Sequence, residues 1–302
     1  MKILSLILCV ITAVYANSSQ DLYPKGKIAE MIKLGEEIIK KTDSHPLTSS
    51  LIKNDLKCVS CHLSGKDGHP GSTDAIGSFV GIAGNYPLYK SREGVVETLQ
   101  DRVDDCFLRS MDGLRPITDT KASIAIVTYI TWLSQDVKID ILNKSASVKK
   151  RDALIKKFNV LQKKASNKNY LNGSRIYQNR CASCHGLKGE GLMSFPPLWG
   201  KDKRGKWLSY NAGAGMSKLD KSAMWIQSNM PFYEGNTLKD QEAADVALYI
   251  NAQQRDVFDL KKKLSLEKDL GYYNSKISSE IDSVESNFKA LGLTLKEIKA
   301  KR

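Results

Sequence analysis

The pentapeptide CVSCH at residues 58–62 decides the fold of this chain, because it recurs as CASCH at residues 181–185. The pattern Cys-x-x-Cys-His attaches a c-type haem: both thiols bond to the haem edge, and the histidine becomes the proximal iron ligand. A zinc knuckle and a redox dithiol are the alternatives for such paired cysteines. Two copies predict two covalently bound c-type haems. The predicted attachment residues are Cys58, Cys61, His62, Cys181, Cys184 and His185.

The N-terminus resembles a secretory signal peptide. Lys2 precedes an apolar run at residues 3–14, and Ala16 is placed for cleavage after it. Export to the periplasm favours covalent haem over zinc or a redox dithiol, which suit a cytosolic protein. The apolar run is shorter than the roughly 20 residues that cross a bilayer, so the sequence predicts no membrane span.

One cysteine is left over from the haem motifs. Of the six cysteines in the sequence, Cys9 lies in the predicted signal peptide and four lie in the two motifs, which leaves Cys106 without a disulfide partner. Most free cysteines are small buried hydrophobic residues, but an odd cysteine in an exported protein can also be reactive. Its position in the sequence favours the second interpretation.

The length of 302 residues suits two small domains, and the two halves of the chain share one design. Each half has a helix, the haem motif, a loop and a closing helix, which is the order of a class I cytochrome c domain. The sequence predicts an all-α fold: two class I cytochrome c domains in tandem, each with one covalent haem, and a C-terminal helical extension. The predicted boundaries are 1–16 for the signal peptide, 17–136 for the N-terminal domain, 137–168 for a lysine-rich linker, 169–255 for the C-terminal domain and 256–302 for the extension.

Apolar periodicity predicts three of the helices. Residues 28–39 carry isoleucines and Met31 at helical spacing, and residues 238–253 form the closing helix of the second half. Between them, apolar residues at helical spacing from Val95 to Cys106, with a stop signal at Asp112-Gly113 and Pro116 beyond, predict a helix of about five turns.

The repeat also locates candidate distal iron ligands. Cys106 lies 44 residues after His62, and Met230 lies 45 residues after His185, so the two assignments support each other. A thiolate ligand from Cys106 should lower the potential of the first haem, whereas the alternative ligand Met111 would raise it. The weaker candidates are Met193, Met216 and Met224 in the second half, and His45 and His69 in the first, which are expected to be solvated loop histidines.

Three polar residues form a row on the helix predicted around Cys106. Arg102, Cys106 and Ser110 are four residues apart, so they are neighbours on a helix surface. A cation, a thiol and a hydroxyl would then face one spot. The alternative for Arg102 and for Arg92 is a solvated helix face paired with nearby acidic residues, and periodicity alone leaves both possibilities open.

Several segments resemble a known family. GNYPLYKSR at residues 84–92 and DRVDDCFLRSMDG at residues 101–113 resemble the signature of the dihaem thiosulfate dehydrogenase and tetrathionate reductase family. GAGM at residues 213–216 and NMP at residues 229–231 resemble its second domain. The resemblance implies an enzyme that interconverts two thiosulfate ions and one tetrathionate ion, and that exchanges electrons with a small cytochrome c or a similar carrier.

The same resemblance implies roles for individual residues. The active site would lie at the first haem, and the second haem would pass electrons outward. The chain departs from the family at two places. Asn229 stands where some members have a lysine that can ligate the second haem, and the tail beyond Arg255 is not part of the family core. The implied roles are iron ligation by His62, Cys106, His185 and Met230, catalysis by Cys106, and substrate binding by Arg92, Arg102 and Ser110.

The net charge of +13 suits dianionic substrates and an acidic partner surface, because a basic field raises encounter rates. The basic runs at residues 149–151 and 163–164 are expected to be solvated surface. An exported cytochrome is not expected to bind nucleic acid. Two alternatives to the enzyme are a dihaem electron carrier without a substrate and a haem subunit of a sulfur-oxidising complex that holds its substrate on a carrier protein.

The C-terminal segment carries an apolar pattern of its own. Seven apolar residues from Ile277 to Ile298 alternate steps of four and three, which predicts one helix with an apolar stripe, weakened near its end by Gly292. Either the protein's own body covers this stripe, or residues 277–298 form an oligomer or partner contact by coiling with a second copy or a partner cytochrome.

Overall fold

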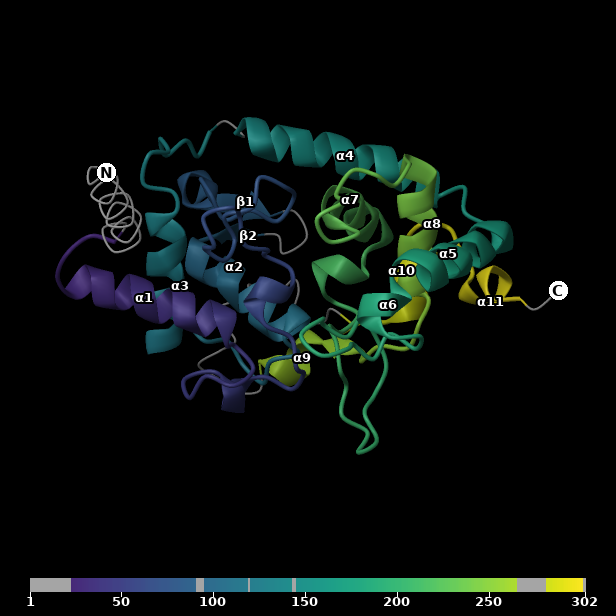
Figure 1. The fold of residues 1–302 in the computed structure, drawn as a ribbon, viewed down its shortest axis with the longest axis horizontal. Helices are drawn as coiled ribbons and strands as arrows, with labels where there is room; N and C mark the ends of the chain where they lie inside the picture. Colours follow the sequence, from purple (N-terminus) through teal and green to yellow (C-terminus); the bar gives the residue numbers. More distant parts are fainter. Residues whose placement is uncertain (1–22, 91–94, 119, 143–144, 265–280, 301–302) are drawn as a thin grey trace, which may run out of the picture.

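The chain folds into two helical halves that lie side by side and are bridged by one long helix (Figure 1). The computed structural model describes residues 23–90, 95–118, 120–142, 145–264 and 281–300. The predicted signal peptide at residues 1–16 lies outside these residues. None of the helices in the described ranges has the length and apolar character that a bilayer span requires.

The N-terminal half is built on two packed helices, α1 (Lys27–Lys40) and α3 (Lys121–Trp132). Ile32, Ile38 and Ile39 of α1 are buried in the core, so the helix predicted from their spacing is confirmed. Shorter helical turns complete this half: η1 (Ser49–Leu51), η2 (Cys58–Ser60) and η3 (Ile82–Asn85).

The helix predicted to begin at Val95 begins later. Strand β2 (Val95–Glu97) instead pairs antiparallel with β1 (Leu88–Lys90), and α2 (Leu99–Asp105) follows. The reason is a capping box, in which the Thr98 hydroxyl accepts from the backbone N–H of Asp101 and the Asp101 carboxylate accepts from the N–H of Thr98. The helix then widens into the π-helical turn η4 (Cys106–Ser110), so the predicted five turns are too many.

The C-terminal half contains the short helices α6 (Ala182–His185) and η5 (Gly215–Ser217) and three longer ones. Helix α8 confirms the predicted closing helix, and it crosses α5 closely at Gly173, where a Cβ atom would lie 2.0 Å from the carbonyl oxygen of Asp245. The longer helices are α5 (Asn167–Arg180), α7 (Leu219–Asn229) and α8 (Asp240–Asn251).

Replacing Gly173 with alanine is expected to lower the free energy of unfolding by about 1–3 kcal/mol, because the added methyl group must push two helix backbones apart. Urea unfolding of the haem-loaded protein measures this loss. The control is Gln178→Ala at an exposed position of the same helix, which should change stability by less than about 0.5 kcal/mol. Equal stability of the two variants would contradict the close crossing.

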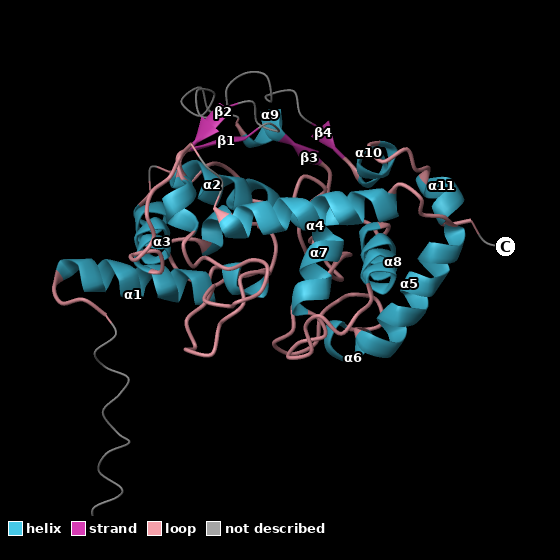
Figure 2. Cartoon of the chain, turned by 90° about the horizontal axis from the view of Figure 1, so that it is seen from above, coloured by secondary structure: helices cyan, strands magenta, loops and turns pink. Residues whose placement is uncertain are grey.

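The predicted linker at residues 137–168 contains helix α4 (Ala146–Gln162), which packs against α7 and α8. It extends along both halves of the molecule (Figure 2). Val148 and Phe158 are its buried apolar residues, and the Gln162 side-chain amide donates to the carbonyl of Ala244 at 2.8 Å. The segment between the two halves is therefore partly structural.

The C-terminal extension is not the single helix that was predicted. Its described part contains α9 (Leu260–Lys263), α10 (Val284–Lys289), α11 (Leu295–Ile298) and an antiparallel pair of strands, β3 (Phe258–Asp259) and β4 (Ile281–Asp282). The strands of both pairs are additions to the predicted all-α fold. The start of the predicted stripe, Ile277, lies outside the described residues.

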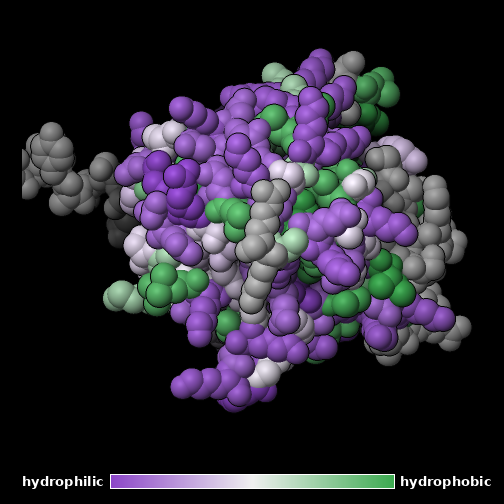
Figure 3. Space-filling view, turned by 90° about the vertical axis from the view of Figure 1, so that its right-hand side faces the viewer, coloured by the Kyte–Doolittle hydropathy of each residue, from purple (hydrophilic) through white to green (hydrophobic). Residues whose placement is uncertain are grey.

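Most apolar residues in the described part of the predicted stripe are covered by the protein itself, whereas Ile281 is 62% exposed. Val284, Phe288 and Ile298 are buried in one cluster with Leu219 and Leu248 of the second half. Gly292 separates α10 from α11 with a backbone φ of 75°, which favours glycine and interrupts the predicted helix. The face that carries α11 is mainly hydrophilic, with separate hydrophobic areas (Figure 3). The prediction that the protein's own body covers the stripe is therefore confirmed for Val284, Phe288 and Ile298.

The extension also contacts the N-terminal half. The Lys263 ammonium lies 2.7 Å from a carboxylate oxygen of Asp112, in a pair that is almost fully buried. The Arg109 guanidinium stacks over the Phe258 ring at 4.3 Å and pairs with Asp105 at 3.2 Å. Because a broken buried pair leaves an uncompensated charge, these contacts hold the extension beside the turn that begins at Cys106.

Candidate functional site

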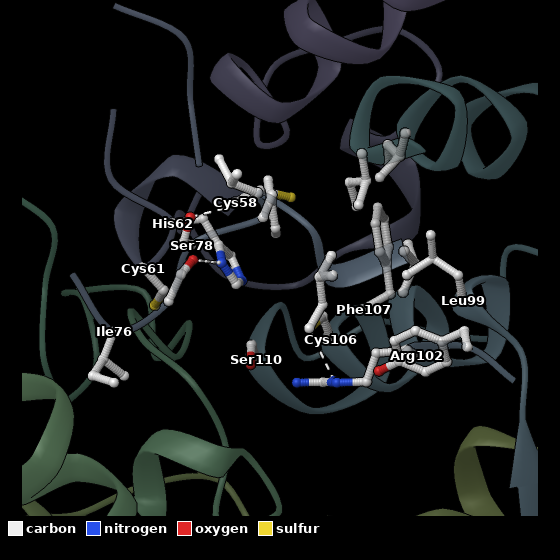
Figure 4. Close-up of a pocket in the computed structure, with 18 of the residues that line it drawn as sticks. Cys58, Cys61, His62, Ile76, Ser78, Leu99, Arg102, Cys106, Phe107 and Ser110 are labelled. Atoms are coloured by element: carbon white, nitrogen blue, oxygen red, sulfur yellow. Dashed lines mark hydrogen bonds between the residues drawn. The ribbon is translucent and has the colours of Figure 1, made fainter. Parts of the chain in front are cut away.

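A cavity of about 320 Å³ lies in the N-terminal half, beside the first haem motif. His62 and Cys106 come from different elements and both line it (Figure 4). The structure therefore brings together the first haem motif, the left-over cysteine and the two neighbours predicted for it in one space. The predicted site residues that line the cavity are Cys58, Cys61, His62, Arg102, Cys106 and Ser110.

His62 is held in the orientation and charge state that an iron ligand needs. Its Nδ1 lies 2.7 Å from the carbonyl oxygen of Gly77, and its ring stacks on Phe79 with the centroids 4.1 Å apart. Since a carbonyl only accepts, Nδ1 carries the proton and Nε2 carries the lone pair. Burial lowers the pKa of His62 to about 4, so the ring is neutral at neutral pH.

The two cysteines of the first motif suit covalent attachment of a haem. Neither forms a disulfide, and the Thr42 hydroxyl donates to Cys58 Sγ at 3.3 Å. Burial raises the pKa of Cys58 and of Cys61 to about 12, so neither sulfur is charged in this apolar setting. Both sulfurs line the cavity, where thioether bonds to a haem edge would form.

The Arg102 guanidinium contacts Cys106, although 40% of its side chain is exposed. Its Nη1 donates to Cys106 Sγ at 3.2 Å, shown as a dashed line in Figure 4, while the nearest Asp105 oxygen is 4.0 Å away. The electrostatic interaction with Cys106 is the largest cause of a raised pKa at Arg102, which keeps this guanidinium positive. Met111, the alternative iron ligand, is buried and lines the same cavity, whereas Arg92 lies outside the described residues.

A second cavity of about 560 Å³ lies beside the second haem motif. The orientation of His185 repeats that of His62: its Nδ1 lies 2.8 Å from the carbonyl oxygen of Pro196, and burial lowers its pKa. Both Met230 and Met216 line this cavity, whereas Met193 is fully exposed and Met224 is packed in the core. Cys181, Cys184 and His185 line the same space.

Comparison with known proteins agrees with this geometry. Residues 170–254 match the cytochrome c family. The thiosulfate dehydrogenase of Allochromatium vinosum is 32% identical over 243 residues, which cover 78% of this chain and 83% of that protein. The chain belongs to the thiosulfate dehydrogenase family. The thiosulfate dehydrogenase of Thiomonas intermedia is 31% identical over 237 residues, which cover 77% of this chain and 68% of that protein.

A solved member of the thiosulfate dehydrogenase family has a similar fold. The thiosulfate dehydrogenase (TsdBA) of Marichromatium purpuratum, in its as-isolated form, aligns with a TM-score of 0.63 and 28% identity over 87% of this chain. The alignment covers 54% of that protein, so this chain spans about half its length. Membership of the family and the cytochrome c match make the chain an oxidoreductase with covalent c-type haem.

The two cavities of this thiosulfate dehydrogenase family member adjoin each other. Leu56, Lys57 and Cys61 line both. The Trp225 indole N–H of α7 donates to the backbone carbonyl of Cys61 at 3.0 Å, and the Asn229 side chain donates to the carbonyl of Ile76 at 2.9 Å. These bonds join the second half to the first haem motif and to the loop that follows it. Sequence periodicity gave no signal for them, because their partners are more than 150 residues apart.

The two other histidines of the N-terminal half do not line either cavity, but the prediction that they are solvated was wrong. His45 is buried, and its Nδ1 accepts from the backbone N–H of Leu47 at 3.1 Å. His69 lies edge-on to Trp132 with ring centroids 5.0 Å apart and beside the Glu36 carboxylate at 3.4 Å. Both histidines have structural contacts that sequence spacing did not indicate.

The zinc knuckle is not supported by the geometry. In the part of the chain that the structure describes, no three side chains of His, Cys, Asp or Glu come together as a site for a metal ion. Each Cys-x-x-Cys pair instead borders a cavity that is also lined by its own motif histidine, and Cys61 lines both cavities. This arrangement matches haem attachment.

Proposed function

We propose that this chain catalyses the two-electron interconversion of two thiosulfate ions and one tetrathionate ion in the cavity at Cys106. The hydrogen bond from Arg102 to Cys106 Sγ, beside the first haem motif, is the observation that carries the proposal. When bound, two haems supply two one-electron acceptors. The proposed iron ligands are His62 and Cys106 at the first haem and His185 and Met230 at the second, and the proposed substrate-binding residues are Arg92, Arg102 and Ser110.

The main electrostatic problem of the reaction is the repulsion between its substrates. Two dianions at about 4 Å repel each other by about 4 kcal/mol even at the dielectric constant of water. A guanidinium offers a planar fork of donors to oxyanions and keeps its charge, so Arg102 can hold one anion beside the thiol. Ser110, on the same cavity wall, can donate to a further oxygen.

Cys106 can act as the nucleophile in a balanced pair of steps. Its thiolate and the outer sulfur of one thiosulfate form a sulfur–sulfur bond as two electrons leave, which gives a Cys106–S–S–SO3⁻ adduct. The outer sulfur of the second thiosulfate then attacks the outer sulfur of that disulfide bond. Tetrathionate leaves, and the Cys106 thiolate is regenerated with no further change in oxidation state.

The adduct is expected to be visible by mass spectrometry. Protein treated with tetrathionate and quenched in acid should contain a Cys106 peptide with the added mass of an S2O3 group, because the thiolate attacks the same sulfur–sulfur bond in the reverse direction. Substitution of Cys106 by alanine is the control that must remove the added mass. An unmodified Cys106 peptide under the same quench would count against the covalent step.

Electrons would leave through the second haem to a small cytochrome c or a similar carrier in the periplasm. Three residues common to the walls of both cavities and the bond from Trp225 to Cys61 support a short path between the haems. The basic net charge of +13 would attract an acidic carrier surface as well as the substrate dianions.

The proposal is tested by assaying the haem-loaded protein with thiosulfate and a small dye as electron acceptor. We expect one tetrathionate for every two thiosulfate ions consumed and two electrons transferred. An electron carrier without a substrate would transfer none. A subunit of a sulfur-oxidising complex would need an added carrier protein, and either of these results would contradict the proposal.

A further inference from the structure

The first turns of α4 form part of the wall of the cavity at Cys106. Ser147, Val148 and Arg151 line it, although they belong to the segment predicted as a linker. Their neighbours Lys149 and Lys150 are exposed. The basic run at residues 149–151 was predicted to be solvated surface. Its two lysines are exposed, as predicted, but Arg151 lines the cavity.

The Arg151 guanidinium has hydrogen-bonding capacity to spare. Its Nη2 pairs with Asp152 at 3.2 Å, but its Nε is buried and has no hydrogen-bond partner within the described residues. A buried N–H without an acceptor costs about 1–3 kcal/mol, so such a group favours a bound acceptor. An oxyanion in the cavity would supply one.

Arg151 and Arg102 contribute positive charge to the same space from different elements. Both residues line the cavity together with Tyr86 and Lys90. Burial raises the pKa of Tyr86, and the charges of Arg102 and then Arg151 act in the opposite direction, so both guanidinium groups act on this one phenol. Arg102 lies at the thiol of Cys106 and Arg151 lies on the α4 side.

We propose that Arg151 is a further anion-binding residue of this cavity, in addition to the substrate-binding residues proposed above. The inference rests on the proposed function, because tetrathionate carries one sulfonate at each end and the Arg102 guanidinium, which lies beside the thiol, serves only the nearer one. Arg102 holds the sulfonate next to Cys106, and Arg151 holds the sulfonate of the second thiosulfate. Helix α4, which joins the two halves, thereby contributes to the active site.

The kinetic test compares Arg151→Gln with Lys150→Gln, which removes the same charge one position earlier on the exposed face of α4. We expect Arg151→Gln to raise KM for thiosulfate about tenfold while kcat changes less than about threefold, since a charge-assisted hydrogen bond is lost from binding. Lys150→Gln should retain the parent KM. Arg151→Lys keeps the charge but loses the planar fork, so its KM should lie between the two.

Inhibition by sulfate gives a second readout of anion binding, because sulfate can occupy the site without being oxidised. Sulfate is a dianion that cannot be oxidised, and its inhibition constant should rise about tenfold in Arg151→Gln but not in Lys150→Gln. Haem content and the midpoint of thermal unfolding should be equal in the two variants. If both variants keep the parent KM and sulfate inhibition, the role of Arg151 is wrong although the proposed function stands. A parent chain that does not oxidise thiosulfate would overturn both.

Discussion

Replacing Cys106 with alanine is expected to lower kcat for thiosulfate oxidation by about a thousandfold or more, which is about 4 kcal/mol of transition-state stabilisation. The substitution removes the proposed nucleophile and the proposed ligand of the first haem together. It also leaves the Arg102 guanidinium without the sulfur that it contacts at 3.2 Å. Dye-linked assays of thiosulfate oxidation and of tetrathionate reduction should lose activity in parallel.

Two further variants separate the roles of the thiol from those of its surroundings. Cys106→Met should retain a sulfur ligand for the iron but remain inactive, because a thioether cannot form the substrate adduct. Met111→Leu, in the same cavity, is a volume-conserving control and should stay close to the parent rate. Normal turnover by Cys106→Ala, or loss of turnover in Met111→Leu alone, would show that the active site has been placed on the wrong sulfur.

Replacing Arg102 with glutamine is expected to lower kcat/KM for thiosulfate about a hundredfold. The change removes a positive charge from the cavity and the charge-assisted hydrogen bond to Cys106 Sγ. Unlike Arg151→Gln, it should affect both kcat and KM, because Arg102 contacts the Cys106 sulfur and is proposed to bind the anion as well. Initial rates across a range of thiosulfate concentrations measure both constants.

The control for Arg102→Gln is Arg204→Gln, which makes the same substitution at a side chain that is 85% exposed. It should leave both kinetic constants unchanged. Arg102→Lys should recover part of the loss, because it restores the charge without the fork of donors. If Arg102→Gln and Arg204→Gln had equal kcat/KM, Arg102 would belong to a solvated helix face, as the alternative interpretation of its spacing held.

The parts of the fold that the sequence predicted are those with strong local signals. Helix α1 follows from isoleucines at helical spacing, and α8 from an apolar pattern that ends the second half. The close approach of Arg102 and Cys106 follows from a separation of four residues, which places two side chains together on one helix face. None of these features depends on distant contacts.

The features that the sequence did not predict depend on caps, breaks and distant partners. Val95 has helical spacing to Leu99, but the N-cap at Thr98 makes the helix begin at Leu99, and Val95 belongs to strand β2. Gly292 divides the apolar pattern of the extension between α10 and α11. Arg151 lines the cavity because α4 packs on α7 and α8. The periodicity of residues within α4 does not indicate that packing.

Whether Cys106 binds the iron of the first haem is tested most directly by electron paramagnetic resonance of the oxidised, haem-loaded chain. We expect two low-spin ferric signals, one with the signature of histidine and thiolate ligands and one with that of histidine and methionine ligands. In Cys106→Ala the thiolate signal should disappear and the other should stay. Two signals of the histidine and methionine type, unchanged by Cys106→Ala, would contradict the proposed active site.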